Sequence, residues 1–254
     1  MEIKNPLYKN IGAHVISSIF TIDKGKIKVL LIKRNNEPFK DKWALVGGAM
    51  YNNELIETAA KRELKEKTNI DDIELTFVGV EDSLNRSPLQ RMFAFNFIGL
   101  VDIEKVHVLK ETTKTNDADW FSIDNIPSLA YDHNKVLNQS IEKLKEMIIS
   151  SNVLKKLYPN GFTIPEIHKV YESILGVEID RRNFRKKLIS QNIIIDTNET
   201  SNFEGKKPAK KYKFNDEIQN QFQALFGFSA FMPFASVQFS CGWLRCRRLW
   251  VRIL

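Results

Sequence analysis

Short apolar runs separated by turn sequences dominate the first half of the chain, which is typical of β-strands. Two β-rich runs, 13–22 and 26–34, flank the sequence DKGK, and this arrangement predicts a hairpin. The sequence KWALVGGAM at 42–50 predicts a third strand that ends in glycines. Further strands are expected at 73–82 and 91–101, and a strand followed by a turn at the proline at 117–127.

Two stretches have helical rather than strand spacing. The first runs from Glu54 to Thr68 and the second from Asn134 to Ile149. Strands with two intervening helices predict an α/β sandwich with a mixed sheet, of about 145 residues, which is a usual domain size. The predicted packed faces are Leu55, Thr58, Ala59, Arg62 and Leu64 in the first helix, and Val136, Leu137, Ile141, Leu144 and Ile148 in the second.

The pattern changes after residue 150. Three short helices are expected in NVLKKLYP, TIPEIHKVYESILG and DRRNFRKKLIS, with Asp180 as the cap of the third. The strands NIIID and KYKFN then enclose a polar, lysine-rich tip. Three helices followed by a β-hairpin with a basic tip predict a winged helix. Its core is expected to contain Ile167, Val170, Tyr171, Ile174, Leu175, Phe184, Leu188 and Ile189.

These patterns divide the chain into a sandwich domain at 1–150, a winged helix at 151–216 and an atypical tail at 217–254. Within the tail, 225–244 carries no charge and is long enough for a membrane span. Pro233 and several small polar residues dilute its hydrophobicity, so we expect a non-native or disordered tail and no membrane association. A membrane or partner helix is the alternative.

The charge is divided unevenly along the chain. The net charge is +7, yet residues 1–150 hold 21 basic and 22 acidic residues, so the excess lies after them. A basic second module favours a polyanionic partner, and a merely solvated lysine-rich surface is the alternative. Both cysteines lie in the tail, which excludes a disulfide framework or cysteine zinc site in the two domains. The first residues lack a secretory signal pattern, and a cytoplasmic protein is expected.

Residues 48–70 carry the most specific motif. The spacing G-x5-E-x7-R-E-U-x-E-E-x-G-U, with U a bulky apolar residue, is matched at all but two of its fixed positions. The chain therefore resembles the Nudix family. The matching residues are Gly48, Glu54, Arg62, Glu63, Leu64, Glu66 and Ile70.

The resemblance implies a Nudix α/β/α sandwich in which a glycine turn approaches a diphosphate and helix glutamates hold Mg²⁺. Two positions depart from the pattern: Lys67 replaces the second consecutive glutamate, and Asn69 replaces a glycine. Asparagine tolerates the left-handed conformation, but the lysine removes a metal ligand and adds an ammonium. Glu63 and Lys67 form a favourable i,i+4 pair, so this ammonium can act as counter-charge to Glu63 or to a ligand phosphate.

We therefore expect a site that binds without cutting and needs no cofactor, with Gly48, Glu63 and Lys67 among its ligand-binding residues. Two alternatives stay open. The box is either a solvated helix face on a degenerate relative, or it retains Mg²⁺-dependent hydrolysis with Glu63 and Glu66 as metal ligands and catalytic residues. Asp132 and His133 match a pair that follows the box in Nudix proteins, and we expect them to cap and pack the second helix. A catalytic role for this acid-histidine pair is the alternative.

The second half resembles the winged helix of Nudix-related transcription regulators of the NrtR type, through YESILG, DRRNFRKKL and GKKPAKKYKFN. The sequence NRSPLQR also resembles the arginine-proline-arginine loop of their sensor domains, which adds Arg86 and Arg91 to the ligand-binding candidates. The resemblance implies a dimer whose effector is ADP-ribose or a related nucleotide in some members and a pentose in others.

The basic residues of this half suit duplex DNA, since arginine reads guanine, asparagine reads adenine and lysine binds phosphate. No stacked aromatics indicate an RNA reader. We expect a metabolite-responsive regulator of operator DNA; alternatives are an active hydrolase of nucleotide-sugar diphosphates and a metabolite-binding module without a DNA role. The DNA-binding candidates are Arg181, Arg182, Asn183, Arg185, Lys186, Lys187, Lys206, Lys207 and Lys210.

Overall fold

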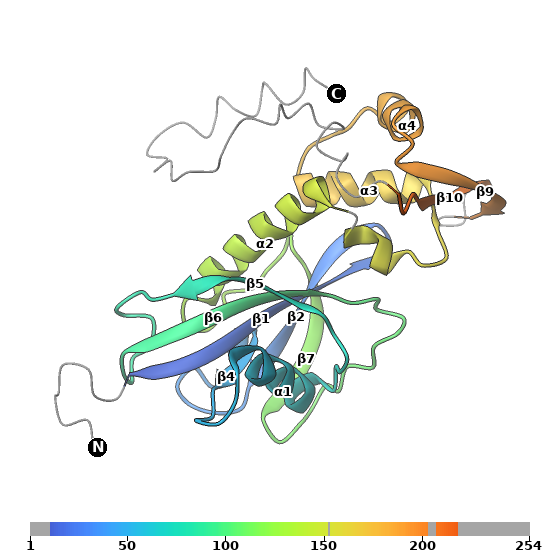
Figure 1. Ribbon diagram of the computed structural model, residues 1–254. Helices are drawn as coiled ribbons and strands as arrows, with labels where there is room; N and C mark the ends of the chain where they lie inside the picture. Colours follow the sequence, from blue (N-terminus) through green and yellow to red (C-terminus); the bar gives the residue numbers. More distant parts are fainter. Residues whose placement is uncertain (1–10, 152, 203–206, 218–254) are drawn as a thin grey trace. The chain divides into compact units, whose positions relative to one another are not determined.

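The computed structural model describes residues 11–151, 153–202 and 207–217. It divides into two compact units, and Figure 1 shows the elements of each. The first unit extends to Thr21 and continues through Ile27–Leu144, and the second contains Ile22–Lys26 and the chain from Lys145. Lys206 and the tail beyond Glu217 lie outside the described residues, so the predictions made for them, including the membrane-span alternative, concern residues that are not described.

A seven-stranded mixed sheet forms the first unit. β1 pairs in parallel with β6, and the pairs β1–β4, β2–β3, β2–β7 and β5–β6 are antiparallel. Lys24 and Gly25 both have positive φ at the turn between β1 and β2, as the hairpin signal predicted. The strands are β1 Gly12–Asp23, β2 Lys26–Arg34, β3 Trp43–Ala44, β4 Val46–Ala49, β5 Leu75–Glu81, β6 Met92–Leu100 and β7 Thr115–Ser122.

Two helices, α1 (Ile56–Thr68) and α2 (His133–Ser150), cover opposite faces of this sheet. Successive residues of a strand point to opposite faces, and β1 shows this directly. Ile19 packs in the core cluster that contains Leu64 of α1, whereas the Ser18 hydroxyl bonds Ser140 of α2 at 2.9 Å. Figure 1 shows the strands between the two helices, which confirms the predicted α/β/α sandwich.

Part of the predicted packed face of α1 is wrong. Leu55 is the residue before the first turn and is 77% exposed, while Ala60 and Glu63 are buried instead. The face that packs against the sheet is therefore rotated toward Glu63. Asn69 ends the helix in the left-handed conformation, with its N–H bonded to the Lys65 carbonyl, so asparagine serves where the family pattern has glycine.

A smaller unit follows, with the order expected of a winged helix. The first predicted helix is a 3-10 helix, η1 (Val153–Leu157), and a short strand, β8 (Phe162–Thr163), precedes α3 (Ile164–Leu175). α4 (Arg181–Ser190) is followed by β9 (Ile194–Ser201) and β10 (Ala209–Phe214), and the sheet order is β8-β10-β9. This arrangement confirms the predicted winged helix.

The helix starts of this unit are capped by side chains. Thr163 and Glu166 form a reciprocal capping box at α3, and the Asp180 carboxylate accepts the Asn183 N–H at α4, as predicted. Tyr171, Phe162 and Phe184 are its largest fully buried side chains. One core prediction is wrong: Ile189 is 42% exposed, because Phe184 and Leu188 form the buried stripe of α4.

Among the described residues, no helix is both long and apolar enough to cross a membrane.

Candidate functional site

Arg62 connects α1 to β4, the glycine-containing strand that precedes it. Its guanidinium makes two hydrogen bonds to the Glu54 carboxylate, at 2.7 and 2.9 Å, and one to the Ala49 carbonyl at 2.9 Å. Glu54 also accepts the Tyr51 N–H at 2.7 Å. These bonds, led by those from Arg62, lower the pKa of Glu54 to about 2 and raise that of Arg62. Arg62 therefore has a structural role: its hydrogen bonds fix the position of α1 relative to β4 and to Glu54.

Gly48 lies directly beneath the Glu63 carboxylate. A Cβ built at this position would overlap the carboxylate atoms, so any larger residue would displace the Glu63 carboxylate from its place. Glu63 is 4% exposed and accepts a 2.6 Å hydrogen bond from Arg62. The structure thus gives Gly48 a packing reason that is independent of any ligand.

The ammonium group of Lys67 also lies beside the Glu63 carboxylate. Its Nζ donates to the Gly47 carbonyl and lies 3.1 Å from Glu63 Oε2. That oxygen is buried and makes no aligned hydrogen bond, so its interaction with Lys67 is an ion-pair contact. Burial lowers the pKa of Lys67 from its ordinary value, Lys114 and Arg34 lower it further, and Glu63 opposes the shift. The side chain is 13% exposed, so its charge is held mostly away from bulk water.

Lys114 completes this group, and the sequence analysis missed it. Its Nζ donates to the Glu66 carboxylate and lies 3.7 Å from Glu63 Oε1. Burial is the largest single influence on Lys114 and disfavours its charged form, but the bond to Glu66 together with the charges of Glu63 and Glu66 raises its pKa. The bond from Lys114 lowers the pKa of Glu66. Lys114 is 48 residues from Glu66 in the chain, and no local spacing rule connects them.

We call these six residues the box cluster. It combines three carboxylates with three cations, so its formal charges balance. No group of three or more potential metal ligands occurs in the part of the chain that the structure describes. The residues present do not fit a Mg²⁺ ion, because ammonium groups contact both candidate carboxylates and the Gly47 carbonyl. The members are Glu54, Arg62, Glu63, Glu66, Lys67 and Lys114.

Additional cations from other elements act on the same region. His14 of β1 is influenced by Arg86, Lys67 and Arg34 as well as Glu63, and its pKa is lowered first by burial and then by these cations. Arg34 of β2 also lies over the Tyr131 ring, 5.0 Å from its centroid. Arg86, Lys67 and Arg34 therefore place positive charge near His14, and such charge attracts anions such as phosphate groups.

Asp132 and His133 fix the start of α2 differently from the prediction. The Asp132 carboxylate accepts two hydrogen bonds from Arg86, at 3.0 and 3.2 Å, instead of capping the helix. His133 Nδ1 accepts the Leu45 N–H at 3.0 Å, and burial followed by the charge of Arg86 lowers its pKa to about 3. The His133 ring is therefore neutral near pH 7 and joins α2 to the sheet.

The two arginines of the 86–91 loop have different surroundings. Arg86 is 7% exposed and donates hydrogen bonds to Asp132, and its charge helps to lower the pKa of His14. Arg91 donates to the carbonyls of Asp82 and Ser83 and lies 4.7 Å from the Phe93 ring centroid. Its contacts hold its own loop, so the structure brings Arg86, but not Arg91, to the region of the box cluster.

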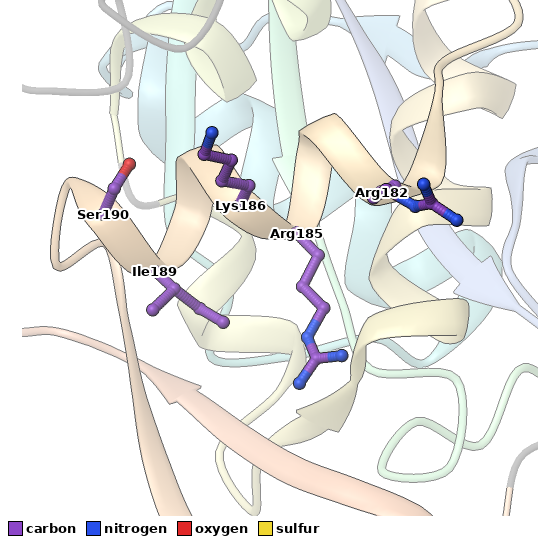
Figure 2. A pocket seen from close by; sticks show the side chains of 5 residues that line it. All are labelled: Arg182, Arg185, Lys186, Ile189 and Ser190. Carbon is purple, nitrogen blue, oxygen red and sulfur yellow. The ribbon is translucent and has the colours of Figure 1, made fainter.

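α4 presents a basic surface in the second unit. Arg181, Arg182, Asn183, Arg185 and Lys186 are exposed, and Lys187 is half-buried. Arg182, Arg185, Lys186, Ile189 and Ser190 line a shallow depression of about 380 Å³. Figure 2 shows these five side chains along the outer surface of α4. Within the described residues, Arg182, Arg185 and Lys186 make no ion pair, so their charges are available to a partner.

The wing lysines differ from those of α4. Lys210 Nζ lies 2.7 Å from an Asp196 carboxylate oxygen, and Lys211 Nζ lies 3.1 Å from one of Glu199. Lys207 is exposed. Two of the wing lysines are therefore already paired across the hairpin, and a DNA phosphate would have to compete with these carboxylates.

Comparisons with known proteins agree with this geometry. Residues 13–144 match the NUDIX domain, and residues 155–214 match the NrtR DNA-binding winged helix domain. The ADPR responsive transcriptional repressor NtrR of Acinetobacter baylyi is 29% identical over 201 residues, which cover 78% of this chain and 79% of that protein.

Two further similarities cover different parts of the chain. An ADP-ribose pyrophosphatase of Methanocaldococcus jannaschii is 37% identical over 110 residues, 43% of this chain and 63% of that enzyme. The crystal structure of Shewanella oneidensis NrtR complexed with a 27mer DNA superposes with a TM-score of 0.63 at 25% identity, and covers 84% of this chain and 95% of that one. The match to NrtR includes both units, whereas the match to the enzyme spans less than half of this chain.

Proposed function

Since the chain belongs to the Nudix family and also carries an NrtR-type winged helix domain, we propose that it is a transcription regulator that binds operator DNA and responds to ADP-ribose. The observation that carries this proposal is the contrast between two sets of charges. The charges of the box cluster balance one another, whereas Arg182, Arg185 and Lys186 of α4 are exposed and make no ion pair among the described residues. The repressor from A. baylyi makes repression the expected sign of regulation.

ADP-ribose is an anionic diphosphate, which suits the cations around His14. Nudix domains are generally Mg²⁺-dependent, but here the Lys67 ammonium contacts the Gly47 carbonyl and Glu63. We therefore propose binding through Gly48, Lys67, Arg86 and Glu63 without a metal requirement. Arg91 would contribute only after leaving its loop carbonyls. A pentose is the second candidate effector.

The full chain tests this proposal directly. Duplexes selected from a random pool would be titrated by fluorescence anisotropy with ADP-ribose, ribose or arabinose, each in EDTA and in Mg²⁺. We expect ADP-ribose to change the DNA affinity equally in both conditions. An effect that requires Mg²⁺ would contradict the metal-free site, and an effect of pentoses alone would replace ADP-ribose as the effector.

An active hydrolase is the second candidate function, because Glu63 and Glu66 are retained and the M. jannaschii relative is an ADP-ribose pyrophosphatase. In Mg²⁺, we expect the wild type to leave ADP-ribose intact and Lys67→Glu to gain the ability to cleave it to AMP. Chromatography of the nucleotides measures this cleavage. Lys65→Glu is the matched control, since Lys65 lies on the same helix, is 59% exposed and pairs with Asp71. Turnover by the wild type would favour the enzyme.

We also propose that the regulator acts as a homodimer. A two-fold protein binds an inverted repeat whose half-sites lie one or two DNA turns apart. Light scattering after size exclusion should give twice the chain mass, and the selected duplexes should contain inverted repeats. A monomeric mass together with single, asymmetric sites would contradict this part of the proposal.

A further inference from the structure

Ile189 is an apolar side chain in an unusual place. It belongs to α4, where Phe184 and Leu188 form the buried stripe, yet it is 42% exposed. Arg182, Arg185 and Lys186 precede it by seven, four and three residues, which places all four along one side of the helix. An exposed isoleucine among three cations has no role in the core of its own domain.

Ile189 borders the shallow depression on α4. The depression has a volume of about 380 Å³ and is lined by Arg182, Arg185, Lys186, Ile189 and Ser190, none of them acidic. In Figure 2 the side chains of Arg185 and Ile189 project from the helix toward the same side. A partner at this surface must therefore offer negative charge and a small apolar group close together.

Duplex DNA offers this combination in its major groove. Guanine presents two acceptors that arginine contacts bidentately, and thymine presents a methyl group that apolar side chains contact. We propose that Ile189 contacts a thymine methyl group beside a base read by Arg185, and is a specificity-determining residue. This inference rests on the proposed DNA-binding function and extends it to a named base and atom.

The helix geometry limits where this thymine lies. Four residues of an α-helix rise about 6 Å, and stacked base pairs are about 3.4 Å apart. The thymine read by Ile189 therefore lies within about two base pairs of the base contacted by Arg185.

Single-atom changes in the DNA test this inference. Duplexes would be selected from a random pool by the full chain, and each thymine would then be replaced singly by deoxyuridine, which lacks only the methyl group. For the wild type, we expect one position near a guanine to lose about fourfold in affinity, the effect of exposing one buried methyl. In Ile189→Ala the same replacement should leave the affinity unchanged.

Ile195→Ala is the matched control. Ile195 lies on β9 of the same domain, is also 42% exposed and does not line the depression, so this variant should keep the fourfold effect. The inference is overturned if no thymine replacement weakens wild-type binding, or if Ile189→Ala retains the effect. A change of oligomeric state in Ile189→Ala with an intact deoxyuridine effect would assign Ile189 to a contact between copies. If no duplex is selected at all, the DNA-binding function itself fails.

Discussion

The box cluster and α4 use the same kinds of charged residues in opposite ways. In the box cluster, three cations contact carboxylates, and the side chains of the most central pair, Glu63 and Lys67, are 6% and 13% exposed. In α4, the side chains of Arg182, Arg185 and Lys186 are exposed and line an open depression. A closed set of charges stabilises its own fold, whereas an open set remains available to a polyanion.

The difference determines what a substitution should change in each region. Removing a charge from a closed, buried set leaves its partner without compensation and lowers stability. Removing an exposed, unpaired cation leaves the fold nearly unchanged and removes a contact to the partner. Stability and DNA affinity should therefore respond to different substitutions.

Glu63→Gln should give the largest effect on stability. The Lys67 ammonium would keep the Gly47 carbonyl but lose its carboxylate, and breaking a buried pair in this way costs about 3 kcal/mol in the free energy of unfolding. Urea denaturation of the Nudix domain measures this change. Glu57→Gln, which alters a surface pair with Lys61 on the same helix, should change stability little.

A double variant separates charge from packing. Glu63→Gln combined with Lys67→Met removes both members of the pair and should recover most of the lost stability, because no unpaired buried charge remains. If the double variant is no more stable than Glu63→Gln alone, the ion pair is not the source of the loss.

Triple substitution of Arg182, Arg185 and Lys186 by alanine should reduce DNA affinity by about 100-fold or more and flatten its salt dependence. Each phosphate contact contributes about 0.9 to the slope of log K against log salt, so the slope should fall by up to about three. The free energy of unfolding should stay close to that of the wild type. Unchanged DNA binding would show that another surface meets the DNA.

Asp196→Asn should strengthen DNA binding by about threefold. The substitution removes the carboxylate that pairs with Lys210 in the wing, so the ammonium no longer has to leave it for a DNA phosphate. Anisotropy titration at low salt measures the change, and Asp216→Asn, outside the wing hairpin, serves as the control. Weaker binding by Asp196→Asn would mean that the ion pair positions Lys210 for the DNA.

The smallest effect concerns acid stability. Arg62 holds the pKa of Glu54 at about 2, below its ordinary value near 4.5. The charged form of Glu54 therefore contributes stability that is fully present above pH 4.5 and is lost as the pH falls toward 2. Glu54→Gln should lower the Tm by a few degrees at neutral pH, and this difference should shrink across that acidic range. A difference independent of pH would assign it to packing alone.

The sequence predicted elements whose signals are local. The helix at Ile56–Thr68, its end at Asn69 and the Asp180 cap of α4 all depend on residues within four positions of one another. The order of elements and the Nudix spacing were sufficient to predict both folds. Errors arose at the margins of helical faces, as at Leu55 and Ile189, because a spacing pattern does not fix how a helix is rotated on its partner.

By itself, the sequence determined that a lysine stands among the box glutamates and that basic residues are concentrated in the winged helix. Only the tertiary structure decided which groups these charged side chains contact. It brings Lys114 to Glu66 across 48 residues, Arg86 to Asp132 across 46 and Lys67 to the Gly47 carbonyl, while it leaves Ile189 exposed beside Arg185. The reason is that ion pairing depends on distance and burial in space, and separation along the chain specifies neither once the contact extends beyond one helix.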